Sequence, residues 1–302
     1  MTVRHFLNLS DHSADTLKRI LGEATRLKVE RGDHAQPLKG KSLAMIFEKN
    51  STRTRVSFEV GMRELGGNPL ILSANDLQLG RGETVADTAR VLSRYVHCIM
   101  MRAMYHENVV ELAHYAEVPV INGLTDATHP CQIMADILTV QERLGTIKGK
   151  KVVWAGDGNN VLHSWINAAP LFEFALHIAC PEGFMPESQY VDAAREKGAS
   201  IIFHHDVQEA AKDADIVTTD TWVSMGNENS ETRRRALTPY QVNDAVMEAA
   251  HEHAIFLHCL PAHRGEEVSA SVIDGTQSVI WDEAENRLHV QKAIINWCMG
   301  VL

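Results

Sequence analysis

Residues 47–58 join the end of an apolar run to a polar helix start and read Phe47-Glu48-Lys49-Asn50-Ser51-Thr52-Arg53-Thr54-Arg55-Val56-Ser57-Phe58. The apolar residues 42–47 predict a strand, and the pattern after Ser51 predicts an amphipathic helix. Backbone N–H groups at a helix start have no intrahelical partner, and the helix dipole adds positive charge there. The hydroxyl groups of residues 51, 52 and 54 and the Arg53 guanidinium would add donors that suit phosphate oxygens. The stretch therefore predicts a strand–turn–helix unit that binds an anion, with simple helix capping as the alternative.

Strand and helix patterns alternate along all 302 residues of the chain. The predicted strands cover residues 42–47, 69–72, 97–101, 118–121, 151–155, 175–179, 200–203, 215–219, 254–258 and 279–281. Such alternation is typical of parallel sheets that are covered by helices on both faces. The sequence therefore predicts an α/β fold with doubly wound parallel sheets.

A change of pattern near the middle of the chain indicates two domains. A predicted helix over residues 131–144 is followed by the polar, glycine-containing segment 145–150, and a new strand-first unit begins after it. The length of the chain also suits two domains of ordinary size. We expect a first domain over residues 1–138 and a second over 139–283. A last helix, from residue 284 to the end, is expected to pack back on the first domain.

The composition excludes several classes of partner. The formal net charge of −10 argues against nucleic acid or an anionic membrane as the main partner. An apolar content of 45% is normal for a globular protein, and no apolar run reaches the length of a membrane span. The five cysteines are an odd number without framework spacing, which favours free thiols in a reducing compartment. With no signal-peptide pattern at the N-terminus, we expect a cytoplasmic protein.

Further polar residues of the first half stand where strands end and helices begin. Arg102 ends a predicted strand, the position at which ligands of open parallel sheets collect. His129-Pro130-Cys131-Gln132 opens a helix, since proline is favourable at a first helical position. An imidazole there can donate to a developing oxyanion, and a glutamine can accept from an amide nitrogen. A capped helix with a buried cysteine is the alternative.

Residues 156–161 suggest a nucleotide-binding turn at first sight. They read Gly156-Asp157-Gly158-Asn159-Asn160-Val161 and follow a predicted strand. The third glycine of the dinucleotide fingerprint is missing, because Val161 stands in its place. A turn that presents Asn160 to a polar ligand is the simpler interpretation.

Two more groups follow predicted strands of the second half. Asp220 could hold an ammonium group or could cap a helix, and the charged stretch 227–235 after Gly226 suggests a mobile loop. His258 and Cys259, with His263 nearby, could suggest zinc. Adjacent residues of an extended chain point to opposite sides, however, and no partner pair completes a metal site. We therefore expect no metal.

Taken in order, these stretches resemble the motifs of the aspartate/ornithine carbamoyltransferase family over nearly the whole chain. The matching motifs are S-T-R-T-R at 51–55, H-P-C-Q at 129–132, G-D-x-N-N at 156–160, D-x-x-x-S-M-G at 220–226 and H-C-L-P at 258–261. The resemblance implies two doubly wound parallel-sheet domains with the active site between them. The first would bind carbamoyl phosphate and the second ornithine, in a homotrimer without metal or organic cofactor. The S-M-G pattern favours ornithine over aspartate as the acceptor.

The resemblance also implies a reaction and a set of residues for it. Carbamoyl transfer from carbamoyl phosphate to the δ-amine of L-ornithine would give L-citrulline and phosphate, a step of arginine biosynthesis. The phosphate would be held by Ser51, Thr52, Arg53, Thr54 and Arg102, and the carbamoyl oxygen polarised by Thr54, Arg102, His129 and Arg287. The carbamoyl amide would be held by Gln132 and by the main chain at Cys259 and Leu260. Ornithine would be held by Asn160, Asp220, Ser224 and Met225, with Cys259 and Asp220 near the reacting nitrogen. Gln78 matches a position from which a neighbouring subunit reaches the site.

Two other classes of function remain as alternatives. A nicotinamide-dependent dehydrogenase is suggested by Gly156 and Gly158, although the missing third glycine speaks against it. A non-catalytic phosphate- or amino-acid-binding module would be expected to lack some of Arg53, His129, Gln132 and Cys259, all of which this chain retains.

Overall fold

The computed structural model describes residues 3–73, 82–223 and 230–302 of the chain. The chain forms two compact units, the first comprising Met1–Leu138 and Glu285–Leu302 and the second Thr139–Ala284. In the described part of the chain, no helix combines the length and apolarity that crossing a membrane requires. Each unit is described by itself below.

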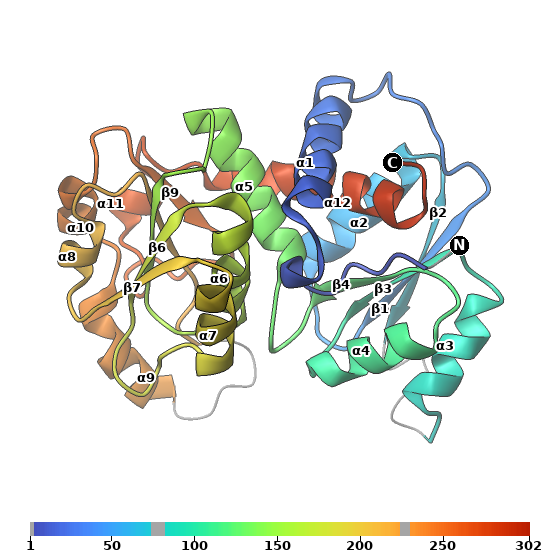
Figure 1. The fold of residues 1–302 in the computed structure, drawn as a ribbon, viewed down its shortest axis with the longest axis horizontal. Coiled ribbons are helices and arrows are strands. Elements are labelled where there is room, and N and C mark those ends of the chain that lie inside the picture. The colour runs from blue at the N-terminus through green and yellow to red at the C-terminus, as the bar shows by residue number, and fades with distance from the viewer. Residues whose placement is uncertain (1–2, 74–81, 224–229) are drawn as a thin grey trace. The chain divides into compact units, whose positions relative to one another are not determined.

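The first unit is built on a four-stranded parallel sheet with the strand order β2-β1-β3-β4 (Figure 1). Its strands are β1 (Ser42–Phe47), β2 (Asn68–Ser73), β3 (Cys98–Arg102) and β4 (Val120–Leu124). Its helices are η1 (Leu9–Asp11), α1 (Ala14–Val29), α2 (Thr52–Glu64), α3 (Val85–Ser93), α4 (His106–Tyr115), the first part of α5 (Pro130–Leu144) and most of α12 (Ile280–Cys298).

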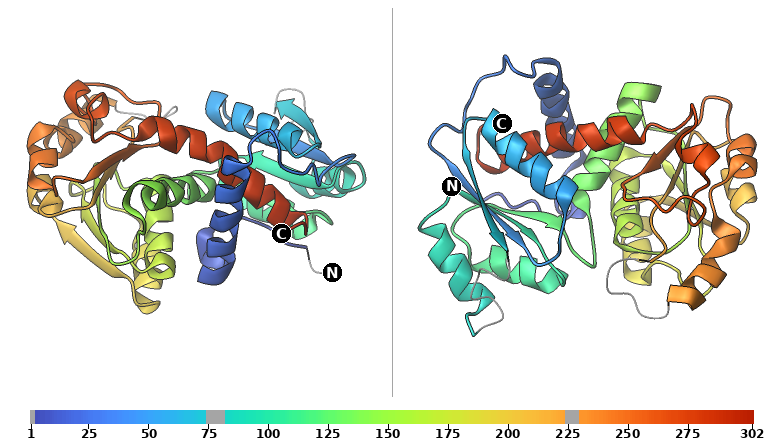
Figure 2. Two further views of the ribbon diagram at one scale, coloured as in Figure 1. Left: turned by 90° about the horizontal axis from the view of Figure 1, so that it is seen from above. Right: turned by 180° about the vertical axis from the view of Figure 1, so that it is seen from behind.

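Helices cover both faces of this first sheet. Apolar residues of β1, β3 and β4 pack with those of α3 and α4 in one buried cluster, which includes Ile46, Ile99 and Leu112. The helices α1, α2 and α12 lie on the opposite side of the sheet (Figures 1 and 2). Because both faces are covered, the central strands β1 and β3 are apolar runs rather than alternating patterns.

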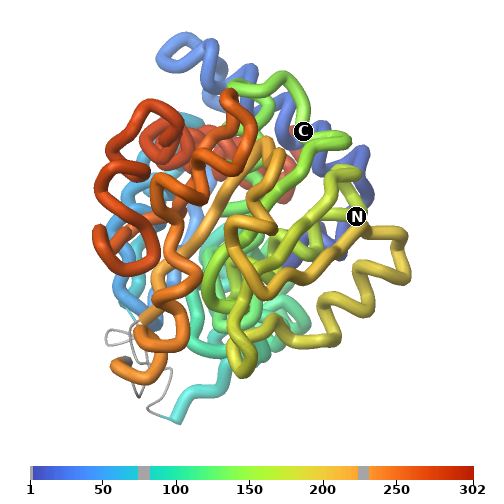
Figure 3. Tube along the Cα trace, turned by 90° about the vertical axis from the view of Figure 1, so that its left-hand side faces the viewer, coloured from blue at the N-terminus to red at the C-terminus, as the bar shows by residue number. Residues whose placement is uncertain are grey.

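The second unit has a five-stranded parallel sheet in the order β7-β6-β5-β8-β9. Its strands are β5 (Lys151–Ala155), β6 (Ala175–Ala179), β7 (Ser200–His204), β8 (Ile216–Thr219) and β9 (Ile255–His258). Its helices are α6 (Asn160–Phe172), α7 (Ser188–Glu196), α8 (Val207–Ala211), α9 (Ser230–Leu237), η2 (Thr238–Tyr240), α10 (Asp244–Ala249) and α11 (Ala270–Ile273). One core cluster joins the sheet to α8, α10 and α11, the side of the unit that faces the viewer in Figure 3, while α6 and α7 lie on the other side.

The predicted doubly wound α/β class is confirmed, because the pairings between the described strands of both sheets are parallel and helices flank each sheet. One predicted strand is wrong. Residues 279–281 do not form a strand; Ile280 begins α12 and is buried in the core of the second unit. A three-residue apolar run is ambiguous between strand and helix, and the acidic first turn of α12, at Asp282 and Glu283, favours the helix.

Each sheet has one point at which the strand order changes direction. In the first unit β2 lies on one side of β1 and β3 on the other, and in the second unit β6 and β8 flank β5 in the same way. Loops that leave the carboxyl ends of neighbouring strands diverge at such a point, which is where open α/β sheets bind ligands. The residues that follow β1, β3, β5 and β8 are therefore the first to consider as site residues.

Candidate active site

A buried hydroxyl group organises the site of the first unit. Ser51 caps α2, where its side-chain oxygen accepts a hydrogen bond from the Thr54 N–H (3.3 Å). Thr54 is 1% exposed, and its Oγ1 accepts from Arg287 Nη2 (2.7 Å) and from Arg102 Nη1 (3.3 Å). A hydroxyl has two acceptor lone pairs and one hydrogen. Two guanidinium groups therefore fill the acceptor capacity of Thr54, and the hydroxyl hydrogen remains as its donor.

The sheet aims Arg102 toward this hydroxyl. Arg102 ends β3 opposite Phe47 of β1, next to the switch point of the sheet. The pairing between β3 and β4 shifts by one residue there, since Met101 pairs with Asn122 but Arg102 pairs with Leu124. A shift of this kind re-aims the side chain at which it occurs. Sequence patterns gave no sign of it.

Gln132 joins the same cluster from the start of α5. Arg287 Nη1 donates to Gln132 Oε1, and Gln132 Nε2 donates to Asp136 Oδ1 (2.8 Å). Gln132 and Asp136 are both buried. The buried carboxylate fixes the orientation of the amide, so that its oxygen faces the arginine. Asp136 has a supporting role that sequence reasoning missed, although it stands one helical turn after Gln132.

His129 lies among the positive charges of this cluster. Burial, together with the charges of Arg287, Arg102 and Arg53, lowers the pKa of the His129 imidazole well below its usual value. The ring is therefore uncharged at neutral pH and can donate one hydrogen bond without adding a fourth cation. The half-buried Arg53 lies close enough for its charge to lower the pKa of His129, as the charges of Arg102 and Arg287 do.

The first unit thus brings together most of the predicted phosphate-side residues. Two guanidinium groups donate to the Thr54 hydroxyl at the helix N-terminus, and these two and Arg53 lie near the neutral His129 imidazole. Thr52, in the first turn of α2, is exposed. Like charges at close range repel in a low-dielectric site, and an anion among them would relieve that repulsion. The arrangement suits a phosphate or phosphate ester.

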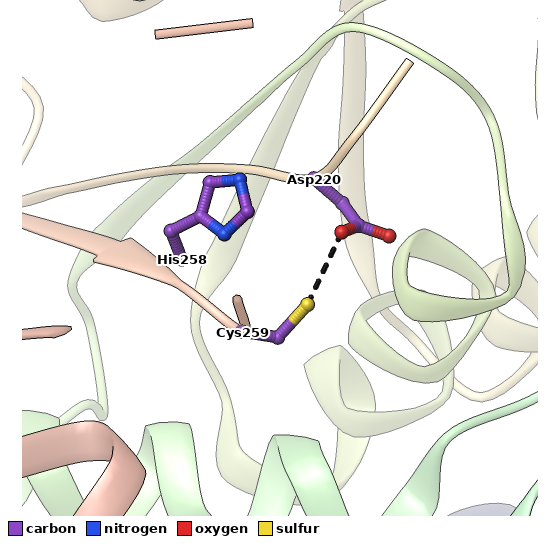
Figure 4. Close-up of side chains that lie close together, drawn as sticks. All are labelled: Asp220, His258 and Cys259. Atoms are coloured by element: carbon purple, nitrogen blue, oxygen red, sulfur yellow. Dashed lines mark hydrogen bonds between the residues drawn. The ribbon is translucent and has the colours of Figure 1, made fainter. Parts of the chain in front are cut away.

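Asp220 is the centre of a second cluster, in the second unit. It directly follows β8 and is 8% exposed. Asn159 Nδ2 donates to Asp220 Oδ2 (2.7 Å), and Cys259 Sγ donates to Asp220 Oδ1 (3.2 Å). Figure 4 shows the thiol and the carboxylate pointing toward each other, with the His258 ring beside them. The predicted neighbourhood of Asp220 and Cys259 is thus present in the structure.

Asn159, the residue before the predicted ligand-binding residue Asn160, joins the start of α6 to Asp220. The Asn159 side-chain oxygen caps α6 by accepting from the N–H groups of Val161 and Leu162, and its nitrogen binds Asp220. Asn160 is the first residue of α6, and its main-chain oxygen accepts from Ser164 Oγ (3.1 Å). Asparagine is a favoured residue at the N-cap, so the capping role of Asn159 could have been predicted from the sequence, and ornithine binding by Asn160 stays a prediction.

A second carboxylate and an arginine flank Asp220. Burial raises the pKa of Asp157 to about 6, against the opposing effect of Arg233 and with a smaller contribution from Asp220. Arg233 binds the Asp157 carboxylate, and its Nε donates to the Trp222 carbonyl (2.9 Å). Its guanidinium also lies over the Phe184 ring, 4.8 Å from the centroid. Neither Asp157 nor Arg233 was singled out from the sequence.

The structure contradicts the geometric reason given against a metal at His258 and Cys259. Their ligand atoms and those of Asp220 all lie within 4.8 Å of one another, because the chain turns after β9 instead of staying extended. The ring nitrogens of His258 are nevertheless both engaged. Nδ1 accepts from the Leu260 N–H (2.9 Å), and Nε2 lies 3.2 Å from Glu267 Oε1. In this arrangement the imidazole has no lone pair to give to an ion.

Three predicted site residues cannot be assessed. Gln78, Ser224 and Met225 lie outside the described residues. Leu260 is described and has a left-handed backbone conformation (φ 58°), which is uncommon for a residue other than glycine.

Comparisons with known proteins agree with this geometry. Residues 4–142 match the model of the aspartate/ornithine carbamoyltransferase carbamoyl-P binding domain, and residues 148–298 match that of the family's Asp/Orn binding domain. The chain is 57% identical over 299 residues to an ornithine carbamoyltransferase of Brucella abortus, covering 98% of this chain and 96% of that protein. It is 55% identical over 301 residues to one of Agrobacterium fabrum, covering 99% of both chains.

Solved structures of proteins with the same name also resemble this chain over nearly its full length. The ornithine carbamoyltransferase from Pyrococcus furiosus superposes with a TM-score of 0.95 at 51% identity, covering 100% of both chains. The anabolic enzyme of that name from Campylobacter jejuni superposes with a TM-score of 0.93 at 41% identity, covering 99% of this chain and 100% of the other. With two matching family models, relatives over nearly its full length and the clusters around Thr54 and Asp220, this chain belongs to the aspartate/ornithine carbamoyltransferase family.

Proposed function

We propose that this protein transfers the carbamoyl group of carbamoyl phosphate to the δ-amine of L-ornithine, which gives L-citrulline and phosphate. The observation that carries the proposal is the cluster around Thr54, where Arg102 and Arg287 donate to one buried hydroxyl beside a neutral His129. The names of the relatives support ornithine as the acceptor. In this proposal the first unit binds carbamoyl phosphate and the second binds ornithine.

The phosphate-side groups bind the dianion and polarise the carbonyl. The N-terminus of α2, with Ser51, Thr52 and Arg53, takes the phosphate oxygens together with Arg102. The Thr54 hydroxyl, His129 and the guanidinium groups donate toward the carbamoyl oxygen. Negative charge grows on that oxygen as the tetrahedral transition state forms, so fixed donors stabilise the transition state more than the substrate.

The carbamoyl amide is oriented by acceptors. Gln132 Oε1, which Arg287 holds in place, is the proposed acceptor for the amide nitrogen. The main-chain carbonyl groups at Cys259 and Leu260 are the proposed acceptors for the other amide hydrogen. Orientation matters here because the nucleophile must approach the carbonyl carbon from one side.

Ornithine is held by the groups around Asp220 in the second unit. The carboxylate of Asp220, together with Asn160 and the S-M-G residues Ser224 and Met225, binds the amino-acid end, and Cys259 lies near the reacting nitrogen. The neutral δ-amine attacks the carbonyl carbon and forms the new C–N bond. The C–O bond to phosphate then breaks, its electron pair leaves with the phosphate, and the amine loses a proton.

One assay tests the proposal directly. Citrulline formation from carbamoyl phosphate is measured with L-ornithine, L-aspartate, putrescine and N-acetylornithine as acceptors under identical conditions. We expect ornithine to have the highest kcat/KM, because putrescine lacks the carboxylate and leaves polar groups of the site unpaired. Preference for aspartate would assign the chain to the other branch of the family. No carbamoyl transfer to any acceptor would refute the proposal.

The resemblance also supports a homotrimer that works in cytoplasmic arginine biosynthesis. In this proposal Gln78 of one subunit contributes to the site of its neighbour. Sedimentation equilibrium measures the mass in solution, and a monomer would contradict the trimer. Growth of an ornithine-carbamoyltransferase-deficient arginine auxotroph on minimal medium, with this chain as the only source of the activity, tests the biosynthetic role.

A further inference from the structure

Glu267 is a fully buried carboxylate that the reaction described above does not use. It is 0% exposed, and its Oε1 accepts from His258 Nε2 (3.2 Å) and from the His263 main-chain N–H (2.6 Å). Burial raises the pKa of Glu267, but the hydrogen bonds from His258 and His263 outweigh it and leave the pKa below its usual value. Glu267 is therefore ionised at neutral pH, and a buried carboxylate keeps its charge only with well-placed donors.

His258 connects this carboxylate to the turn after β9. The His258 main-chain N–H donates to Glu283 Oε2 (2.8 Å), and its Nδ1 accepts from the Leu260 N–H (2.9 Å). A backbone N–H can only donate, so Nδ1 carries no hydrogen and the ring hydrogen is on Nε2, which faces Glu267. One tautomer of His258 thus satisfies both contacts, and Glu267 favours that tautomer.

The turn after β9 contains a strained backbone conformation that contacts with other residues must stabilise. Leu260 has φ 58°, a left-handed conformation that persists only where the surroundings hold it. Its N–H is bound by His258, and the preceding Cys259 is bound by Asp220 through its thiol. A loss of the correct imidazole tautomer would release the Leu260 N–H and with it the orientation of the neighbouring carbonyl groups.

We propose that Glu267 is a positioning residue for the carbamoyl amide. It acts through His258, whose tautomer it fixes, and thereby sets the orientation of the Cys259–Leu260 main chain. This inference rests on the proposed function for the role of that main chain, but the link from Glu267 through His258 to Leu260 is a property of the protein alone.

Three variants separate this role from a general effect of charge. Glu267→Leu removes the acceptor, whereas Glu267→Gln keeps an oxygen at the Oε1 position. Glu266→Leu is the matched control, because this neighbouring glutamate binds Arg234 Nε (3.1 Å) and has no contact to His258 among those described. We expect kcat/KM for carbamoyl phosphate to fall by about thirtyfold in Glu267→Leu and to stay within about threefold of wild type in the other two. Equal losses in Glu267→Leu and Glu266→Leu would overturn the proposal.

A second readout follows the tautomer without any substrate. In ¹H–¹⁵N spectra of the imidazoles, the His258 signals, assigned by their loss in His258→Asn, should show hydrogen on Nε2 in the wild type. Glu267→Leu should show a mixture of tautomers. An unchanged tautomer in that variant would overturn the proposal. Should Glu267→Leu not fold, Glu267→Asp replaces it, since the shorter side chain draws the carboxylate away from Nε2 and should give a smaller shift of the same kind.

A double variant tests whether Glu267 acts through His258. Asparagine at position 258 keeps an acceptor for the Leu260 N–H but is too short to reach Glu267. Adding Glu267→Leu to His258→Asn should therefore reduce kcat/KM little further, and full additivity would show that Glu267 acts by another route. A wild type that forms no citrulline but shows the expected tautomer would refute the proposed function and leave the link intact.

Discussion

Thr54 is a residue whose role depends on two partners far away in the sequence. Arg102 and Arg287, which donate to its hydroxyl, are 48 and 233 positions distant. The cluster places positive charges close together, which costs free energy unless an anion is bound. The neutral His129 limits that cost, because burial and the three arginines keep its pKa low. We therefore expect these charged residues to contribute to anion binding more than to stability.

Replacement of Arg53 should reduce activity without unfolding the protein. Arg53 lies in the first turn of α2, and its charge contributes to the lowered pKa of His129. Loss of a charge-assisted contact to the phosphate in Arg53→Ala should weaken transition-state binding by about 3 kcal/mol, which is about a hundredfold in kcat/KM. Steady-state kinetics and the thermal unfolding midpoint measure the two effects.

Arg63→Ala is the matched control for this prediction. It removes the same charge from the last turn of the same helix, where the exposed Arg63 pairs with Glu59 (3.1 Å). Its kcat/KM should remain at the wild-type value. Wild-type catalysis in Arg53→Ala would show that α2 does not bind the phosphate.

At the scale of elements, α12 has more than one task. It carries Arg287 to the Thr54 hydroxyl and, further along, Lys292, whose Nζ binds Glu64 Oε2 at the end of α2 (2.7 Å). Lys292 and the neighbouring His289 are fully buried. Two contacts, one near each end of α2, join this helix to α12.

Acid should destabilise the protein through His289 of α12. Burial, together with the charges of Lys292, Lys28 and Arg31, lowers the pKa of His289 to about 3, with Glu64 opposing. The unfolded chain would titrate near pH 6.5, so between about pH 6.5 and 3 it binds a proton that the folded state does not. The free energy of unfolding should therefore fall as the pH falls through this window, and be independent of this group above it.

His289→Gln isolates this contribution, because glutamine does not titrate. Urea unfolding at pH 7.0 and pH 5.0 gives the decrease in the free energy of unfolding between these two pH values for each protein. The decrease should be smaller in the variant by at most about 1.4 kcal/mol per pH unit, the value for one whole proton. Identical decreases in the two proteins would mean that His289 takes up its proton in the folded state as well.

The turn after β5 is shaped by packing at Gly158. A Cβ atom there would lie 2.3 Å from the main-chain nitrogen of Pro186, and the Gly158 N–H donates to the Phe184 carbonyl (2.8 Å). The glycine thus serves contact with a neighbouring segment, which weakens the dinucleotide interpretation of the turn. It also keeps Asn159 in position to cap α6 and bind Asp220.

Gly158→Ala should therefore reduce both stability and affinity for ornithine. Overpacking of this kind typically costs about 1–3 kcal/mol, and displacement of Asn159 should raise KM for ornithine more than KM for carbamoyl phosphate. Gly22→Ala in α1 is the control, since nothing lies within 4 Å of the added Cβ. That variant should gain up to about 1 kcal/mol, as expected for alanine in a helix. Equal unfolding midpoints of the two variants would contradict the packing role of Gly158.

At the scale of the whole molecule, the groups proposed for the two substrates belong to different units. Ser51 to Thr54, Arg102, His129, Gln132 and Arg287 are in the first unit, and Asn160, Asp220 and Cys259 are in the second. Carbamoyl transfer requires the two substrates to meet, and water must be kept from the activated carbamoyl group. We expect the binding of one substrate to change the affinity for the other.

Ornithine should accordingly bind weakly to the free protein and at least about tenfold more tightly once a carbamoyl phosphate mimic is bound, a coupling of about 1.4 kcal/mol. Calorimetric titration with norvaline, which lacks the reacting amine, measures this with and without an unreactive phosphonate mimic. Arg53→Ala serves as the control, because loss of the mimic should abolish the gain. Equal affinities in both titrations of the wild type would show that the two units bind their ligands independently.

The sequence by itself determined the fold class and most of the chemistry. Alternating apolar strands and amphipathic helices specify parallel sheets, because side-chain periodicity is a local property of the chain. The motifs around Ser51, His129, Asp220 and Cys259 were also readable, since each places its polar groups within a few residues at a strand end. The substrate-binding and catalytic roles of the residues in these motifs, and that of Gln78, stay predictions.

Only the tertiary structure decided which side chains meet. It brought Asn159 to Asp220 and Arg233 to Asp157, and it started α12 at Ile280 where a strand was expected. It also turned the chain at Leu260, so that His258 and Cys259 lie close together instead of on opposite sides. These outcomes depend on contacts between residues that are far apart in the sequence. Periodicity describes neighbours along the chain, whereas buried polar groups find their partners wherever packing brings donors and acceptors together.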